Sequence, residues 1–229
     1  MQKGKAMKTL LIFILSAALV EGEILLYKAA AIHPADQGPI KNGQLLVEDD
    51  RIVAIGSEIT IPEGTREVDL GKLQVYPGLI AATTSLGLTE INAIRATQDT
   101  SEVGDFSPDV EAWVSVNPDS ELIPVARANG FTHALVAPMG GVVTGTSGLI
   151  KTSGWGVEDM TVKSSVALHI MWPSLLINTT PKDSMRNPDK YKTPRDQARE
   201  RDKKLLNINR FFDDAEAYAK ARKLKKDLA

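Results

Sequence analysis

Short apolar runs separated by turn residues dominate residues 23–74. The strand-like runs are Glu23–Ala31, Gln44–Val47, Arg51–Gly56 and Arg66–Leu70. The acidic residues Glu48-Asp49-Asp50 separate the second run from the third, which favours a hairpin turn. Gly38-Pro39 and Asn42-Gly43 are further turn dipeptides. Strands at this spacing predict a small β-sandwich over residues 23–74.

From Val75 onward, apolar runs alternate with a helical pattern. Val75–Ala82 and Thr132–Ala137 read as buried strands, and Glu121–Asn129 reads as the helix between them. Asp119-Ser120 supplies an N-cap for this helix, and Gly130 supplies its C-terminal stop. Such alternation predicts βα units on a parallel sheet over residues 75–180. The expected fold class is therefore α/β.

The last fifty residues are strongly charged, and Asp196–Lys226 has the spacing of a helix with one apolar face. The apolar positions are Leu205, Leu206, Ile208, Phe211, Phe212, Ala215, Tyr218 and Ala219. We expect residues 181–229 to form a charged, mostly helical segment. Its charges predict a solvated helix face, and a partner-binding arm is the alternative.

The N-terminus has the pattern of a secretory signal peptide. Lys3, Lys5 and Lys8 precede the apolar run Leu10–Leu15, and Ser16-Ala17-Ala18 supplies small residues for cleavage. The apolar stretch is shorter than the roughly 20 residues that span a bilayer. Residues 1–22 are therefore predicted to direct export to the periplasm or the medium, with cleavage after position 18 or 22 and no membrane attachment afterwards.

Composition excludes several kinds of site. The chain has 27 basic and 29 acidic residues, so its overall charge does not indicate a nucleic-acid partner. It has no cysteine, which excludes disulfides and thiolate metal sites. His33, His133 and His169 are widely spaced. We expect His33 to be a strand-end residue and the other two to be hydrogen-bonded core residues rather than ligands.

The segment Gln74–Leu88, QVYPGLIAATTSLGL, resembles the first barrel strand of the metal-dependent amidohydrolases. The upstream segment IKNGQLLVEDDRIVAIG resembles the opening of a cyclic amidohydrolase. NPDSELIPVARANGFTHALVAPMGG is similar to the imidazolonepropionase-like branch of that superfamily. The resemblance extends from Ile24 to about Ser174. It implies a small β-sandwich beside a TIM-type barrel, and hydrolysis of the C–N bond of a non-peptide, cyclic amide.

The same resemblance places the metal-binding histidine pair of the family on Thr83 and Ser85, and its aspartate on Ala81. Neutral hydroxyls are poor ligands for the zinc expected in active members. We therefore predict no metal, no other cofactor and no identified catalytic residue in this chain. A hydroxyl nucleophile is an alternative, although no histidine is near in sequence to activate it. A non-catalytic binding or assembly module is the alternative function.

The predicted barrel is incomplete. A (β/α)₈ barrel needs about 250 residues, and roughly 150 remain after the signal and sandwich segments are subtracted. We therefore expect a truncated or split protein that self-associates or binds a fragment completing the barrel. Thr132–Ala137 and Val166–Met171 are the strands expected to be exposed.

Three further groups of residues are candidates for chemistry. The Gly-rich segment Met139–Gly148 is either a phosphate cradle or a tight βα loop. The acidic residues Asp99, Glu102, Asp105, Asp109 and Glu111 either pair for acid–base work or solvate a long surface loop. Trp113, Trp155 and Trp172 either line a pocket or belong to the core.

Overall fold

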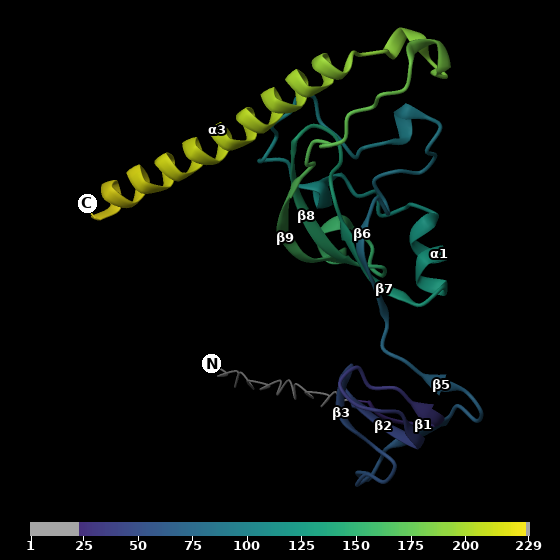
Figure 1. Cartoon of the computed structure of the whole chain (residues 1–229). Coiled ribbons are helices and arrows are strands. Elements are labelled where there is room, and N and C mark those ends of the chain that lie inside the picture. Colours follow the sequence, from purple (N-terminus) through teal and green to yellow (C-terminus); the bar gives the residue numbers. More distant parts are fainter. Residues whose placement is uncertain (1–22, 228–229) are drawn as a thin grey trace, which may run out of the picture. The chain divides into compact units, whose positions relative to one another are not determined.

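The computed structural model describes residues 23–227, so the predicted signal peptide lies outside the described residues. The chain divides into two compact units, Met1–Pro77 and Gly78–Ala229 (Figure 1). Across the described residues, no helix combines the length and apolar character needed to cross a membrane. The α/β class expected from the sequence is confirmed, since both units contain sheets and the second also contains helices.

The first unit is a five-stranded sheet with the order β3-β2-β1-β4, in which β5 also pairs with β1. Its strands are β1 (Ile24–Ile32), β2 (Ile40–Glu48), β3 (Arg51–Gly56), β4 (Arg66–Asp69) and β5 (Gln74–Val75). The first three strands are antiparallel, and β4 and β5 run parallel to β1. β1 is central and uses both of its edges, so these five strands are joined in one hydrogen-bonded sheet.

The predicted hairpin turn is confirmed in detail. Asp49 and Asp50 are the only residues between β2 and β3, and their φ angles are +47° and +62°. Two-residue loops with both φ angles positive match the twist of the flanking strands, and aspartate tolerates this conformation better than most residues. The turn fixes the register in which Glu48 pairs with Arg51.

The second unit is built on a four-stranded sheet with the order β6-β7-β8-β9. Its strands are β6 (Leu79–Thr84), β7 (Phe131–Val136), β8 (Val143–Lys151) and β9 (Thr161–Ile170). β6 and β7 are parallel and are joined through helix α1 (Leu122–Ala128), which gives one β–α–β unit. β7, β8 and β9 are antiparallel neighbours. The parallel arrangement stops at β7 because the connection 137–142 is too short for a crossover.

This topology changes which strands have free edges. β7 pairs with β6 on one side and β8 on the other, so the expectation that Thr132–Ala137 forms an exposed edge is wrong. β9 is an edge strand, and its stretch Val166–Ile170 is largely exposed, as expected for that run. The opposite edge is β6, whose side chains Leu79 and Ile80 are 53% and 62% exposed.

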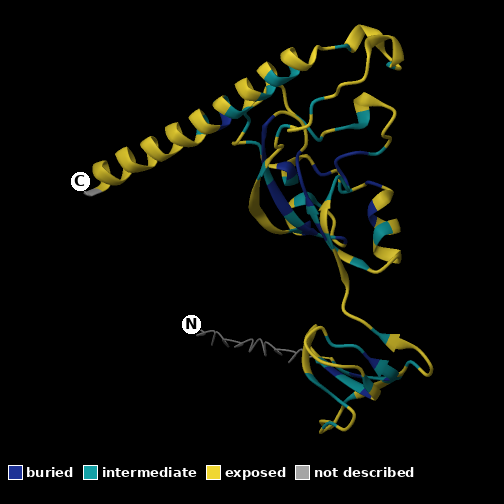
Figure 2. Ribbon diagram, in the orientation of Figure 1, coloured by how far each residue is buried: buried dark blue, intermediate teal, exposed yellow. Residues whose placement is uncertain are grey.

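The core of the second unit lies between the sheet and the segments that precede α1 (Figure 2). Its buried residues are Leu88, Ala112, Val116, Ile123, Ala134, Val136, Ile150 and Met160. The segment between β6 and α1 contains two short 3-10 helices, η1 (Arg95–Thr97) and η2 (Ala112–Ser115). Ala112 and Val116, from η2 and its end, cover the sheet with apolar side chains.

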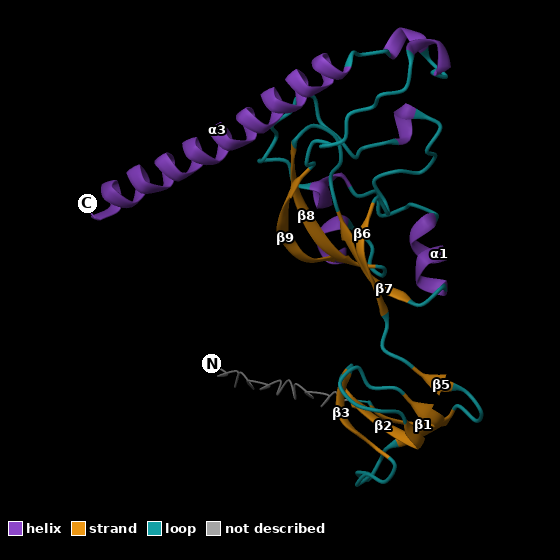
Figure 3. Cartoon of the chain, viewed as in Figure 1, coloured by secondary structure: helices purple, strands orange, loops and turns teal. Residues whose placement is uncertain are grey.

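The remaining helices follow β8 and β9 (Figure 3). They are α2 (Val157–Met160), η3 (Lys182–Ser184), η4 (Pro188–Lys190) and the long helix α3 (Pro194–Asp227). α3 agrees within two residues with the predicted helix Asp196–Lys226. It packs on its own unit through Ile208, which is 2% exposed, and Phe211, whose ring centroid lies 5.5 Å from that of Phe106.

An exposed ion pair links β8 to α2. Lys151 Nζ donates to Asp159 Oδ1 at 3.0 Å, and the backbone N–H of Trp155 donates to Asp159 Oδ2 at 3.1 Å. Together these bonds hold the pKa of the Asp159 carboxyl below its usual range, with the Lys151 hydrogen bond as the largest cause. The pair is solvent-exposed and therefore positions α2 and the loop before it more than it stabilises the fold.

Candidate functional site

The carboxyl end of β6 is the first candidate site, because Thr83 and Ser85 lie there. Thr83 is the penultimate residue of β6 and is exposed, and its hydroxyl donates to the Ala82 carbonyl oxygen at 2.7 Å. Ser85 follows the strand and is half-buried. Its carbonyl oxygen accepts hydrogen bonds from the N–H groups of Leu88 (2.9 Å) and Thr89 (3.1 Å). Thr83 thus lies at the end of the strand, and Ser85 opens the turn that follows it.

These residues do not fit a zinc ion. A hydrolytic zinc site uses about three nitrogen, oxygen or sulfur ligands that converge on one point, and neutral hydroxyls are weak donors. Within residues 23–227, no group of three or more His, Cys, Asp or Glu side chains could hold a metal. The side chains of Thr83 and Ser85 therefore offer hydroxyl oxygens rather than imidazole nitrogens at the end of β6.

Glu90, which the sequence analysis did not single out, directly follows this turn and is half-buried. Its carboxylate accepts from the Ser120 hydroxyl at 2.9 Å and from the Asn117 amide at 3.3 Å. Ser120 is buried and also accepts from the Leu122 N–H at 3.3 Å, at the start of α1. Glu90 therefore ties the segment after β6 to the residues just before α1. No motif in the sequence marks this pairing across thirty residues.

The structure does not bring the three histidines together. His33 directly follows β1, as expected, where it stacks on Tyr76 with ring centroids 4.2 Å apart. His133 on β7 hydrogen-bonds the Thr132 hydroxyl at 3.0 Å, as expected, but it is half-buried and does not belong to the core. His169 on β9 differs from expectation, because its Nε2 is buried without a hydrogen-bond partner among the described residues.

The expected Gly-rich loop Met139–Gly148 is mostly strand. Residues from Val143 onward belong to β8, which is largely buried, so neither a phosphate cradle nor a tight βα loop is formed. Several of the backbone donors are already used. The N–H groups of Val142 and Val143 donate to the Asp105 carbonyl oxygen at 2.7 and 2.8 Å, and that of Thr146 donates to Val110 at 2.7 Å. These three N–H groups are therefore not free to bind an anion.

The acidic residues of 99–111 lie on a surface loop, as the sequence predicted. All five side chains are exposed, and none forms an ion pair with another described residue. Glu111 accepts from the Trp113 indole N–H at 2.9 Å. No pair of these carboxylates is held together for acid–base work. The loop instead uses its backbone carbonyl groups, which hydrogen-bond β8.

The tryptophans divide between core and surface. Trp113 packs against the core of the second unit, which agrees with the core alternative rather than the pocket alternative. Trp155 and Trp172 are 97% and 60% exposed, so for them neither a core nor a pocket role is correct. Both follow strands in segments with few apolar neighbours, and the sequence carries no signal that separates them from Trp113.

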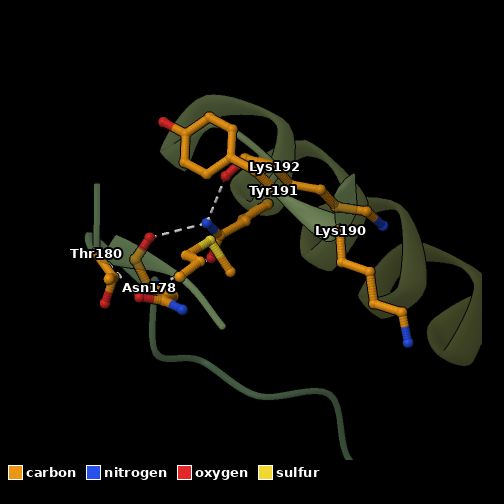
Figure 4. Close-up of a pocket in the computed structure, with 7 residues that line it drawn as sticks. Asn178, Thr180, Lys190, Tyr191 and Lys192 are labelled. Carbon is orange, nitrogen blue, oxygen red and sulfur yellow. Dashed lines mark hydrogen bonds between the residues drawn. The ribbon is translucent and has the colours of Figure 1, made fainter. Parts of the chain in front are cut away.

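A pocket of about 250 Å³ lies where the segment after β9 meets the start of α3 (Figure 4). Its lining residues are Asn178, Thr180, Met185, Lys190, Tyr191, Lys192 and Gln197. Gln197 crosslinks the pocket, since it accepts from the Asn178 N–H at 2.8 Å and donates to the carbonyl oxygens of Asn178 and Lys192 at 2.9 Å. Lys192 pairs with Glu200 at 2.6 Å. The polar groups are thus used to anchor α3.

Comparisons with known proteins bear on the fold. No family model matches the chain, and no curated protein matches it. Among solved structures, an amidohydrolase from Thermotoga maritima is similar with a TM-score of 0.70 and 24% identity, over 87% of this chain and 49% of that one. An ochratoxinase from A. niger matches with a TM-score of 0.30 and 20% identity, over 49% of this chain and 25% of that one.

The chain therefore has a partial amidohydrolase fold. The described units correspond to a portion of the Thermotoga structure, and the chain spans about half the length of that protein. This agrees with the resemblance found in the sequence, which also covered only an N-terminal portion of the amidohydrolase pattern.

Proposed function

We propose that this chain is a non-catalytic binding or assembly module built on an amidohydrolase scaffold. The observation that carries the proposal is the pair Thr83 and Ser85 at the end of β6, where the sequence resemblance places the metal-binding histidines. One hydroxyl is engaged by the Ala82 carbonyl and the other residue opens a turn. The scaffold is retained while the donor atoms of a metal site are not.

The two sheet edges of the second unit support a partner that completes the fold. β6 and β9 each have one free edge among the described strands. Leu79, Ile80 and Val162 on these strands are all more than half exposed. Free edges with apolar side chains are surfaces on which further strands add. A polypeptide carrying the other barrel strands, in the same protein or in a separate one, is the partner that this function requires.

We expect the purified protein to hold far less than one equivalent of zinc. The physical reason is that two neutral hydroxyls cannot replace two imidazole ligands. Elemental analysis after dialysis against micromolar zinc gives the measurement. The matched variant Thr83→His with Ser85→His restores two nitrogen donors at the same backbone positions and should bind zinc more tightly. One tightly bound metal per chain in the natural protein, lost on Thr83→Ala with Ser85→Ala, would contradict the proposal.

Hydrolysis of the C–N bond of a non-peptide, cyclic amide is the second candidate function. It is favoured by the similarity of the fold to the Thermotoga amidohydrolase, at a TM-score of 0.70. A panel of cyclic amides, assayed with and without added zinc, separates the two functions. Turnover by the natural chain would favour the hydrolase, and its loss in the Thr83→Ala variant would place Thr83 in the reaction. No turnover in either condition favours the assembly module.

Export of the protein is a further part of the proposal. The basic start, apolar run and small residues within positions 1–22 support a cleaved signal peptide. We expect the mature protein to begin at Leu19 or Glu23 and to be found in the periplasm or medium. N-terminal sequencing of the protein from fractionated cells tests this. An intact Met1 on protein confined to the cytosol would refute it.

A further inference from the structure

Two exposed segments of the second unit carry opposite charge. The acidic loop, residues 99–111, contains Asp99, Glu102, Asp105, Asp109 and Glu111 and no Lys or Arg. The basic end of α3, residues 217–226, contains Lys220, Arg222, Lys223, Lys225 and Lys226 and no Asp or Glu. All ten of these side chains are exposed.

These charges are almost entirely unpaired. In the part of the chain that the structure describes, the basic end forms one ion pair, between Lys220 and Glu216, and the acidic loop forms none. Concentrated like charges repel one another and favour a surface of opposite sign. Each segment therefore has the chemistry to recognise the other.

The acidic loop of the same copy is already packed on the middle of α3. Phe106, within the loop, contacts Phe211 with ring centroids 5.5 Å apart. From Phe211 to Lys225 the helix rises about 21 Å, at roughly 1.5 Å per residue. Figure 1 shows that this end of α3 extends away from the sheet of its own unit. The basic end thus lies well beyond the loop contact of its own copy.

An apolar stripe continues from this contact toward the basic end. Ile208 and Phe211 are followed at helical spacing by Ala215, Tyr218 and Ala219. Beyond Phe211 the stripe is no longer buried. Every described residue from 212 to 226 is exposed, and Tyr218 is 68% exposed. The alanines leave room for another helix to approach closely. The exposed stripe of Ala215, Tyr218 and Ala219 therefore continues the face of α3 that packs on its own unit.

We infer that α3 pairs antiparallel with α3 of a second copy of this chain, about a two-fold axis near residue 216. In such a pair, residues 220–226 of one copy lie opposite residues 212–206 of the other. That is the part of α3 on which the acidic loop packs. Each basic end then lies beside the acidic loop of the partner, and both contacts form at once because the interface is symmetric.

This inference goes beyond the proposed function, since it uses α3 and the acidic loop and neither Thr83 nor the sheet edges. A zinc-binding protein would sink the assembly-module proposal and leave the helix pairing intact. Association through the sheet edges would support the assembly module and contradict the helix pairing, because it would not depend on the charges of α3.

Sedimentation of the full chain at micromolar concentration tests the pairing. We expect a dimer at low ionic strength whose dissociation constant increases with added salt. The variants Lys223→Glu with Lys225→Glu, and Asp105→Lys with Asp109→Lys, should each weaken the dimer by about tenfold or more, because each places like charges in both contacts. Mixing the two variants should restore a heterodimer, since every contact then joins opposite charges.

The control variant is Lys203→Glu with Lys204→Glu, which makes the same charge change on an exposed part of α3 outside the contact. It should leave the dissociation constant within about twofold of the natural value. Two results would overturn the inference: a monomer at tens of micromolar protein in low salt, or an association that both reversed variants retain unchanged.

Discussion

Replacing Ile150 with alanine is expected to lower the free energy of unfolding of the second unit by about 3 to 4 kcal/mol. Ile150 lies on β8 with no exposed surface, inside the cluster that contains Val136, Ile123 and Met160. The substitution removes three carbon atoms from a site where neighbours from β7, α1 and α2 cannot all move inward. The lost transfer free energy and the remaining cavity therefore both contribute.

Urea unfolding followed by tryptophan fluorescence measures this effect, because Trp113 packs against the same core. Ile80→Ala is the matched control, since it makes the same change at a side chain that is 62% exposed. Its expected cost is below about 1 kcal/mol. Equal costs at the two positions would show that the core is not where the structure places it.

Local sequence signals were sufficient for the elements whose stability is local. The two-residue turn at Asp49-Asp50 lies between two apolar runs, and its chemistry is that of a hairpin. Helix α3 has a continuous helical pattern over more than thirty residues, so its bounds were predicted within two residues. The run of apolar and β-branched residues in Thr132–Ala137 predicts a strand, and the structure has β7 there within one residue at each end.

Strand β8 could not be predicted because its sequence has the composition of a loop. VTGTSG combines glycine with small polar residues, which usually marks a turn. In the structure these residues are buried between β7 and β9 and against the acidic loop. Because β8 pairs antiparallel with β7, the sheet is not parallel throughout as expected. Its free edges therefore belong to β6 and β9 and not to β7. Such errors arise because pairing partners distant in sequence decide the structure.

At the candidate site, the residues themselves were found only through the resemblance to the amidohydrolases. Nothing in the pattern of TTSLGL marks Thr83 and Ser85 as special. Their surroundings were not predictable, because the hydrogen bonds of Glu90 to Ser120 and Asn117 join segments about thirty residues apart. Sequence reasoning thus supplied the positions as a prediction, and only the structure showed how the turn after β6 is held.

Replacing Gly145 with alanine is expected to destabilise the second unit by about 3 to 5 kcal/mol, from overpacking and backbone strain together. A Cβ at this position would lie 2.5 Å from the Val110 carbonyl oxygen and 2.8 Å from its Cβ. The same carbonyl accepts the Thr146 N–H at 2.7 Å, so it cannot move without breaking that bond. The glycine of the supposed phosphate loop is therefore a close-packing residue between β8 and the acidic loop.

Gly104→Ala separates the two contributions to this cost. Gly104 has the same φ angle of +114° as Gly145, but a Cβ built there would meet no atom within 4 Å. It should therefore cost only the backbone strain, about 1 to 2 kcal/mol. The difference between the two variants in urea unfolding then measures the contact with Val110 alone. If Gly145→Ala cost no more than Gly104→Ala, the acidic loop would not be docked on β8, and the hydrogen bonds from Val142, Val143 and Thr146 to that loop would have to be absent in solution.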